Sequence, residues 1–219
     1  MKSTDVINTQ IHKEGNLFIA GGAALSAILF WLLPPLGWIA LLLTVFCIYF
    51  FRDPERVVPE GDDLVISPAD GTVATVGPAK PPKELEGLKG DYTRISIFLS
   101  VFDVHVNRIP VSGDVTALRY ISGEFLDAAD DRASEQNERQ LIAVKTPQKK
   151  TVVLAQVAGL VARRILCDLE PDQAVEAGER FGLIRFGSRT DLYLPKGYTV
   201  LVKPGQTMIG GETVLAKLD

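Results

Sequence analysis

The sequence predicts a mainly β fold of the α+β class, preceded by an N-terminal membrane-associated helical hairpin. Two observations support this prediction. An apolar run without any charged residue covers residues 17–51, and from residue 64 onward short apolar stretches alternate with turn-forming residues. Long uncharged runs are typical of membrane helices, whereas short stretches separated by turns are typical of β-sheets. We therefore expect two parts, residues 1–56 and residues 57–219.

The apolar run is interrupted at Pro34 and Pro35. Proline lacks a backbone N–H and clashes with the preceding helical turn, so this pair divides the run into two helices. Each helix would have about 17 residues and a length of roughly 25 Å, slightly below the hydrocarbon thickness of roughly 30 Å. The hairpin either crosses the membrane twice or is re-entrant. A buried helical pair in a globular core is the alternative.

Basic residues flank both ends of the predicted hairpin, with Lys2 and Lys13 before it and Arg52 and Arg56 after it. Because Lys and Arg near membrane segments favour the cytoplasmic side, we expect both ends of the hairpin in the cytoplasm. No small-residue cleavage site directly follows the apolar run, so we expect the first residues to be retained.

The remainder of the chain has the pattern of a β-rich domain. A charged linker with prolines follows residue 51, and neither a strand nor a membrane helix is expected in it. Residues 125–137 are polar enough for a surface helix or loop, and residues 80–91 are expected to form an exposed excursion. The predicted strands are residues 64–66, 72–76, 94–99, 115–121, 140–145, 151–157, 161–166, 183–186, 192–194, 198–202 and 213–217.

Composition argues against several classes of protein. A net charge of −4 argues against nucleic acid as a partner, because phosphate binding needs a dense basic surface. The two cysteines, Cys47 and Cys167, have no spacing typical of a disulfide or metal framework, which fits a reducing compartment. The chain has only two histidines, so an imidazole needed in the β-rich part must come from His105 rather than His12.

The stretch from Phe181 to Pro195 reads as a strand-like segment interrupted by Gly187 and Ser188. Glycine adopts backbone angles that other residues avoid, so the Gly187 carbonyl can turn toward the Ser188 hydroxyl. That geometry permits an N-to-O acyl shift. A glycine-serine step between strand residues is more commonly a turn or bulge, so the dipeptide alone leaves both interpretations open.

Four stretches in sequence order resemble one protein family. They are residues 51–56 (Phe-Arg-Asp-Pro-Glu-Arg), 67–71 (Ser-Pro-Ala-Asp-Gly), 98–110 (Phe-Leu-Ser-Val-Phe-Asp-Val-His-Val-Asn-Arg-Ile-Pro) and 185–195 (Arg-Phe-Gly-Ser-Arg-Thr-Asp-Leu-Tyr-Leu-Pro). Together they resemble the short-form bacterial phosphatidylserine decarboxylase proenzymes, from about residue 51 to the C-terminus. Each stretch alone is a weak signal, but their combination in this order is specific.

The resemblance implies a self-processing enzyme that makes its own cofactor. Ser188 would attack the Gly187 carbonyl, elimination would cleave the resulting ester, and hydrolysis with loss of ammonia would leave a pyruvoyl group. The β chain (1–187) and the α chain (188–219) would stay associated. The pyruvoyl group formed from Ser188 would accept the electrons released on decarboxylation, without a metal or a bound coenzyme. The implied reaction converts phosphatidylserine to phosphatidylethanolamine at the cytoplasmic face of the cell membrane.

The resemblance also assigns roles to Asp70 and His105. It places the aspartate equivalent to Asp70 in the machinery of self-cleavage, although Pro-Ala-Asp-Gly is also a turn sequence in which Asp70 would cap the turn. His105 follows an apolar strand pattern and is the best available proton donor or acceptor, because the pKa of imidazole lies near neutral pH. A histidine that only packs in the core or lies on the surface is the alternative.

Arg108 marks a departure from the longer bacterial relatives, which have a second histidine three positions after the first. Arginine stays protonated and cannot act as the base. Either His105 serves both self-cleavage and decarboxylation, or the base for one step lies elsewhere. Arg108 is suited to bind the phosphate or carboxylate of the substrate, and a surface or salt-bridged arginine is the alternative.

Two segments, residues 67–73 and 203–214, resemble the hammerhead strands of biotinyl and lipoyl carrier domains. A non-enzymatic, membrane-anchored module of this type is the alternative function. It lacks a carrier lysine in the expected turn and leaves Arg185–Ser188 unexplained. A decarboxylase of a related phosphoserine lipid is a further alternative, and a homo-oligomer stays open.

Overall fold

We describe the fold from a computed structural model of the chain, which describes residues 9–128, 130, 132–160, 164–185 and 188–219. Backbone contacts divide the chain into two compact units, Met1–Glu55 and Arg56–Asp219.

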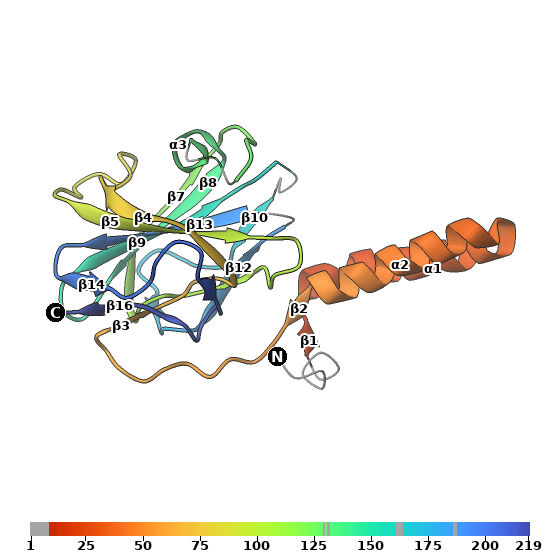
Figure 1. Ribbon diagram of the computed structural model, residues 1–219, viewed down its shortest axis with the longest axis horizontal. Helices are drawn as coiled ribbons and strands as arrows, with labels where there is room; N and C mark the ends of the chain where they lie inside the picture. The colour runs from red at the N-terminus through yellow and green to blue at the C-terminus, as the bar shows by residue number, and fades with distance from the viewer. Residues whose placement is uncertain (1–8, 129, 131, 161–163, 186–187) are drawn as a thin grey trace. The chain divides into compact units, whose positions relative to one another are not determined.

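The N-terminal unit is a helical hairpin (Figure 1). Its elements are β1 (Gln10–Ile11), a 3-10 turn (Lys13–Gly15), α1 (Asn16–Leu32), α2 (Pro34–Phe50) and β2 (Arg52–Asp53). The break falls at Leu33, which has φ −152° and ψ 85°, and Pro34 is the first residue of α2. Proline is tolerated there because the first helical N–H has no partner within the helix. The predicted hairpin, interrupted at the prolines, is confirmed.

The two helices approach closely where Gly22 faces Thr44, since a Cβ added at Gly22 would lie 2.5 Å from the Thr44 Oγ1. The hydroxyls between the helices bond to their own backbone, with Thr44 donating to the Ala40 carbonyl at 2.8 Å. Large apolar side chains such as Leu17 and Trp31 are exposed. Among the described residues, Lys13–Leu32 is the one helix long and apolar enough to cross a membrane, and Pro34–Phe50 is shorter.

The second unit is built from one large antiparallel sheet and two small ones. The large sheet has the strand order β11-β7-β8-β9-β13-β5-β4-β15, and the small sheets have the orders β10-β12-β6 and β14-β16-β3. The strands are β3 (Leu64–Ile66), β4 (Gly71–Ala79), β5 (Tyr92–Leu99), β6 (Val106–Arg108), β7 (Gly113–Ile121), β8 (Arg139–Lys145), β9 (Thr151–Val157), β10 (Ile165–Cys167), β11 (Ala174–Val175), β12 (Arg180–Ile184), β13 (Ser188–Pro195), β14 (Tyr198–Val200), β15 (Thr207–Met208) and β16 (Val214–Leu218). The predicted mainly β class is confirmed.

The main core lies on one face of the large sheet, which we call the inner face. Leu192 of β13 is directly opposite Ile95 on β5 and Leu154 on β9, and all three belong to the same buried cluster. Val65 of β3 and Phe181 of β12 belong to it as well, so both small sheets pack on the inner face. Burial of this apolar surface is the main force that holds the three sheets together.

The opposite, outer face of the large sheet has a smaller core of its own. Tyr193 and Val153 pack there with Leu85 and with Ala133, the first residue of the short helix α3 (Ala133–Gln136). The excursion at residues 80–91 was predicted to be exposed, and this prediction is wrong in part because Leu85 is buried. Its apolar side chain covers the outer face, which a sequence pattern of polar and turn residues does not reveal.

The segment from Phe181 to Pro195 forms strand residues on both sides of the glycine-serine step, as predicted, but the two strands belong to different sheets. Its first residues belong to β12 in a small sheet, and Ser188 begins β13 in the large sheet. Alternating apolar residues continue on both sides of the glycine-serine step, so the sequence pattern does not show that the chain changes sheets. Ser188 therefore begins a strand in a different sheet from the strand that ends at Ile184, and Phe186 and Gly187 lie outside the described residues.

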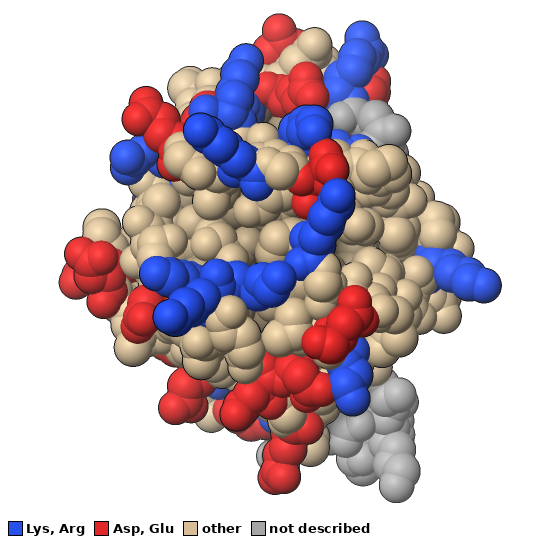
Figure 2. Space-filling model, turned by 90° about the vertical axis from the view of Figure 1, so that its left-hand side faces the viewer, with Lys and Arg blue, Asp and Glu red and all other residues tan. Residues whose placement is uncertain are grey.

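The two hammerhead-like segments pair with each other. Thr207 of β15 is opposite Thr72 of β4, and Val214 of β16 is opposite Ile66 of β3. Acidic and basic side chains are interspersed with uncharged ones on the face of the molecule shown in Figure 2. Charges of both signs on this face agree with the small net charge of the chain.

Candidate active site

Ser188 is the first residue of β13, an interior strand of the large sheet. It is directly opposite Leu99 of β5 on one side, and the next residue, Arg189, is opposite Val157 of β9 on the other. Ser188 is 0% exposed, and its Oγ has no hydrogen-bond partner within the described part of the chain. Of the two residues at the predicted cleavage site, the structure describes Ser188, and Gly187 lies outside the described residues.

His105 lies between a turn at Ser100–Asp103 and strand β6, and it is fully buried. Its Nδ1 is 2.9 Å from the carbonyl oxygen of Asp103. A carbonyl only accepts hydrogen bonds, so the Nδ1 must carry a proton and donate it. In the neutral ring the Nε2 is then deprotonated and can act as a base.

Strand pairing brings His105 and Ser188 to the same end of the domain. The Ile184 amide donates to the His105 carbonyl at 3.4 Å, which extends the β12–β6 ladder by one residue. Ser188 follows Ile184 by only four residues, a span of at most about 14 Å. Gln156, which faces Thr190 on the inner face, donates from its Nε2 to the Asn107 Oδ1 at 2.9 Å. The strand beginning at Ser188 and the strand following His105 thus face each other across the inner layer.

Asp70 is held just before β4 by two partners. The Arg56 Nη2 lies 3.0 and 2.8 Å from the two carboxylate oxygens, and the Gly210 amide donates to the Oδ1 at 2.7 Å. Burial raises the pKa of Asp70, although Arg56 and the Gly210 hydrogen bond act in the opposite direction. Arg56 and Gly210 were missed from the sequence as partners of Asp70, and the only signal was the position of Arg56 in a resembling stretch.

Strand register relates the backbone of Asp70 to that of Ser188 through the strand β5. Thr72 is opposite Phe98 and Ser188 is opposite Leu99, so β5 separates the two residues by two strand spacings, roughly 10 Å. Within the described residues, the hydrogen bonds of the Asp70 carboxylate go to Arg56 and Gly210 rather than to His105 or Ser188. A role of Asp70 in self-cleavage stays a prediction.

Arg108 points to a different side of β6 from His105. Side chains alternate along a strand, so His105 and Asn107 share one side and Arg108 has the other. The Arg108 Nη1 donates to the Gly178 carbonyl at 2.9 Å, and the residue is buried. A Cβ added at Gly211 would lie 2.7 Å from the Arg108 Cδ, so the arginine stem packs directly on that glycine. The predicted role of Arg108 in substrate binding stays a prediction.

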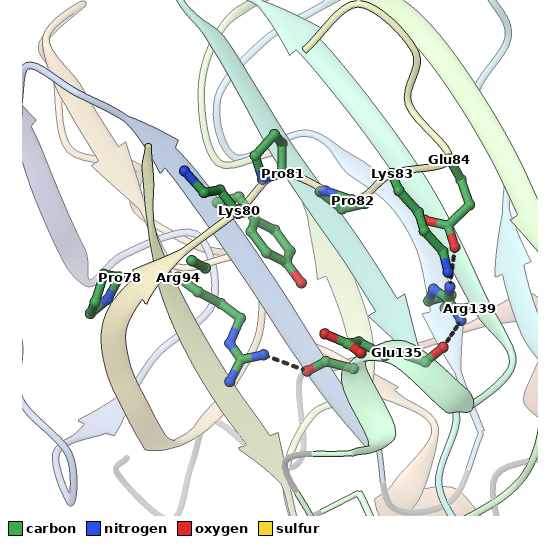
Figure 3. Close-up of a pocket in the computed structure, with 12 residues that line it drawn as sticks. Pro78, Lys80, Pro81, Pro82, Lys83, Glu84, Arg94, Glu135 and Arg139 are labelled. Carbon is green, nitrogen blue, oxygen red and sulfur yellow. Dashed lines mark hydrogen bonds and ion pairs between the residues drawn. The ribbon is translucent and has the colours of Figure 1, made fainter. Parts of the chain in front are cut away.

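A pocket of about 440 Å³ lies on the outer face, on the opposite side of the large sheet from Ser188 (Figure 3). It is lined in part by Arg94, Arg139 and Tyr193. Arg139 pairs with Glu84 at 2.6 Å, and Arg94 donates to the Ser134 hydroxyl at 3.1 Å. Burial and the charge of Asp191 raise the pKa of Tyr193 to about 12, so this hydroxyl keeps its proton at neutral pH. Its place on the outer face separates it from Ser188.

A buried serine hydroxyl at the start of an interior strand and a buried histidine on a segment paired with the preceding strand are groups that an enzyme with a serine-derived reaction centre can use. Ser188 begins a strand of the large sheet, whereas β12, the strand before it in the chain, belongs to a small sheet. Among the described residues, no group of three or more His, Cys, Asp or Glu side chains could hold a metal ion.

Comparison with known proteins identifies the family. The family model for phosphatidylserine decarboxylase matches residues 43–216. A protein named phosphatidylserine decarboxylase proenzyme from Cereibacter sphaeroides is 51% identical over 217 residues, covering 98% of this chain and 94% of that protein. The chain belongs to the phosphatidylserine decarboxylase family, and it is a decarboxylase. The resemblance seen in the sequence is confirmed, and the non-enzymatic carrier-like module is not favoured.

Proposed function

We propose that the chain is a self-processing enzyme that converts phosphatidylserine to phosphatidylethanolamine and CO2 in phospholipid biosynthesis. The observation that carries the proposal is Ser188, a fully buried serine without a hydrogen-bond partner among the described residues, at the start of an interior strand. Family membership supports the substrate, and the word proenzyme in the name of the relative supports processing.

The residues present fit a pyruvoyl group made from Ser188. The serine supplies the three carbons of the group, and its buried, unpaired hydroxyl is available for reaction. Such a group, once formed, supplies an electron sink for the electron pair released when the bond to CO2 breaks.

Self-cleavage is proposed to begin with attack of the Ser188 hydroxyl oxygen on the Gly187 carbonyl carbon. The His105 Nε2 takes the hydroxyl proton and returns it to the amide nitrogen as the peptide bond breaks and an ester forms. Loss of the Ser188 Cα proton then breaks the bond between Cβ and the ester oxygen, and Gly187 leaves as a carboxylate. Water then hydrolyses the remaining dehydroalanine. Its nitrogen leaves as ammonia, and the oxygen of the water becomes the keto oxygen of the pyruvoyl group.

Asp70 is proposed to accept the Cα proton in the elimination step. Its raised pKa makes the carboxylate a stronger base than an exposed aspartate, and Arg56 fixes its orientation. His105 is proposed to act a second time, by donating a proton to the substrate carbon that has lost CO2. The hydrogen bond from its Nδ1 to the Asp103 carbonyl makes the Nε2 the unprotonated nitrogen of the neutral ring. Arg108 is proposed to bind an anionic group of the substrate.

The two chains are proposed to stay together after cleavage. In the β13 ladder, residues of the α chain pair with β5 and β9 of the β chain on both sides. Two further strands of the α chain, β15 and β16, pair with β4 and β3. These hydrogen-bonded ladders and the shared core support a stable two-chain enzyme.

We also propose that the hairpin anchors the enzyme at the cytoplasmic face of the cell membrane. The apolar helix at Lys13–Leu32 supports membrane attachment, and the basic residues at both ends of the hairpin support the cytoplasmic face. Anchoring keeps the enzyme beside a substrate that itself remains in the bilayer.

The test is decarboxylation by the purified full-length protein in mixed micelles of detergent and phosphatidylserine labelled in the serine carboxyl group. Release of labelled CO2 with formation of phosphatidylethanolamine is expected, and a Ser188→Ala variant should release none. A parent protein that is cleaved but forms no phosphatidylethanolamine would contradict the proposed substrate. Phosphatidylserine turnover equal to the parent's in the Ser188→Ala variant would contradict the proposed chemistry.

A further inference from the structure

Three buried polar residues beside Ser188 have no part in the steps proposed above. Thr190 follows Ser188 by two residues on β13, Gln156 is directly opposite Thr190 on β9, and Asn107 lies on β6. All three are 0% exposed. They lie between the large sheet and a small sheet, where most neighbouring side chains are apolar.

The amides of Gln156 and Asn107 join the two sheets by their own hydrogen bond. The Gln156 Nε2 donates to the Asn107 Oδ1 at 2.9 Å and lies 3.2 Å from the Leu166 carbonyl. Gly182 of β12 makes room for this contact, since an added Cβ would lie 3.2 Å from the Gln156 Nε2 and 2.1 Å from the Leu166 oxygen. The backbone of the small sheet is therefore close enough to hold the Gln156 amide in place.

The other polar atoms of this set have no hydrogen-bond partner among the residues that the structure describes. Within the described residues, the Asn107 Nδ2, the Gln156 Oε1, the Thr190 Oγ1 and the Ser188 Oγ make no hydrogen bond. Most buried polar atoms in folded proteins are paired, because an unpaired one costs free energy. Two donors and one acceptor next to Ser188 are thus left for a ligand that offers the complementary groups.

We infer that Asn107, Thr190 and Gln156 form the recognition site for the α-amino acid head group of the substrate. The Asn107 amide and the Thr190 hydroxyl donate to the carboxylate, and the Gln156 Oε1 accepts from the ammonium group. This inference rests on the proposed function and deepens it. All three residues are fully buried in the uncleaved chain.

The chemistry of decarboxylation favours such neutral donors over an arginine. A guanidinium would bind the negative carboxylate strongly in the ground state, but this charge leaves as CO2, so that stabilisation would be lost in the transition state. The surroundings are correspondingly apolar, because Leu99 and Ile97 lie opposite Ser188 and Thr190 on the same inner face. Arg108 lies on the other side of β6 from Asn107.

Thr190→Val is the most direct variant, because valine keeps the shape of threonine and lacks the hydroxyl. Thr75→Val is a matched control, since the Thr75 Oγ1 is also buried without a partner in the described chain. Thr75 is opposite Ser96, and Ser96 is opposite Asp191. Thr75 therefore lies on the outer face of the sheet, away from Ser188. Thr190→Ser restores the hydroxyl and tests whether the loss in the valine variant is due to that group.

The measurement uses processed full-length enzyme whose pyruvoyl carbonyl has been capped with hydroxylamine, so that binding is measured without turnover. Titration calorimetry compares glycerophosphoserine, which carries the carboxylate, with glycerophosphoethanolamine, which lacks it. Thr190→Val should weaken glycerophosphoserine binding by about tenfold and leave glycerophosphoethanolamine unchanged, as expected for loss of one hydrogen bond to a charged group. Thr75→Val and Thr190→Ser should bind both probes like the parent, and uncleaved Ser188→Ala should bind neither.

Equal binding of glycerophosphoserine by Thr190→Val and the parent would overturn the inference, as would an equal loss for both probes. If Thr190→Val does not fold, Gln156→Glu provides the second variant. Its added negative charge should repel the carboxylate and weaken glycerophosphoserine binding more than glycerophosphoethanolamine binding, and parent-like binding of both probes would overturn the inference. Failure of the proposed function has a different signature, because a parent protein that is never cleaved has no carbonyl for hydroxylamine to cap.

Discussion

Along β13, the polar side chains on the two faces of the large sheet are in two different states. On the outer face, Arg189 donates to Asp191 at 2.7 Å and to the Asp130 carbonyl at 3.1 Å, and Ser134 also bonds to Asp191. On the inner face, only a few residues away along the same strands, Ser188 and Thr190 make no side-chain hydrogen bond within the described chain. Both sets are fully buried.

This difference separates polar groups that hold the fold from polar groups prepared for chemistry. The buried ion pair of Arg189 and Asp191 fixes α3 and the segment before it against β13 through its bonds to Ser134 and Asp130. Groups bonded in this way are not free to bind a ligand. Unpaired buried groups cost stability, and proteins keep them where a reaction or a ligand needs them. The outer face has a cavity, shown in Figure 3, but the charged side chains Arg94 and Arg139 that line it are bonded to other protein groups. The inner face around Ser188 is therefore the better candidate for the active site.

The largest effect on the inner face is expected from His105→Ala. Without the Nε2, the transfer of a proton from Ser188 fails, so the variant should accumulate as uncleaved chain or, if cleaved, turn over at least about a hundredfold more slowly. Gel analysis of processing and a phosphatidylethanolamine assay measure the two effects. Cleavage and turnover at the parent's rates would show that His105 is structural.

Asp70→Asn should slow self-cleavage by about a hundredfold, because the amide cannot accept the Cα proton in the elimination step. Hydroxylamine should then release the chain from the accumulated ester, which distinguishes a failed elimination from a failed acyl shift. Arg56→Gln is the control, since it alters the orientation of Asp70 and keeps the base. An Asp70→Asn protein that is cleaved at the parent's rate would remove Asp70 from the mechanism.

On the outer face, Arg189→Met should destabilise the fold by about 3–5 kcal/mol, because it leaves the buried Asp191 without its main partner. Urea unfolding of the variant and of the double variant Arg189→Met, Asp191→Leu measures this. The double variant should recover much of the loss, and the fraction that folds should still be cleaved. A variant of parent stability that is not cleaved would assign Arg189 to the chemistry and break the distinction between the faces.

Arg108→Gln should have a smaller effect, confined to the KM for phosphatidylserine, if the arginine binds an anionic group of the substrate. A rise of about tenfold in KM with normal processing is expected for loss of one charge-assisted hydrogen bond. An unchanged KM would leave Arg108 with its structural bond to the Gly178 carbonyl.

Deleting residues 1–50 should leave both faces of the sheet intact, because residues 56–219 form a compact unit of their own. The truncated protein should still cleave itself and should no longer sediment with vesicles. Complete sedimentation of the truncated protein would show that the surface of the β unit is sufficient for attachment.

The sequence predicted well where local pattern determines structure. Residues 64–66 and 151–157 form strands with the predicted bounds, and the prolines end the first helix as expected. Very short strands such as β6 and β15 were missed because two or three residues show no period. The sheet change between β12 and β13 was also missed, since it depends on packing between layers.

For the candidate site, the resembling stretches located Ser188, His105 and Asp70 but gave no partners for them. Arg56 reaches Asp70 only through the fold, because 13 residues lie between them in the chain. Gln156 stands in an ordinary strand pattern, and no sequence signal separates it from an exposed glutamine. Its position opposite Thr190 and its bond to Asn107 exist only once two sheets are packed together.

Self-cleavage beside Ser188 is the step on which the proposed chemistry depends, and the intact mass of the purified protein measures it. Two species are expected, a large one ending at Gly187 and a small one spanning 188–219 whose amino terminus is blocked and lacks the serine. Ser188→Ala should give a single full-length mass. A parent protein that keeps one full-length mass after prolonged incubation, or a small species with a free amino-terminal serine, would contradict the account.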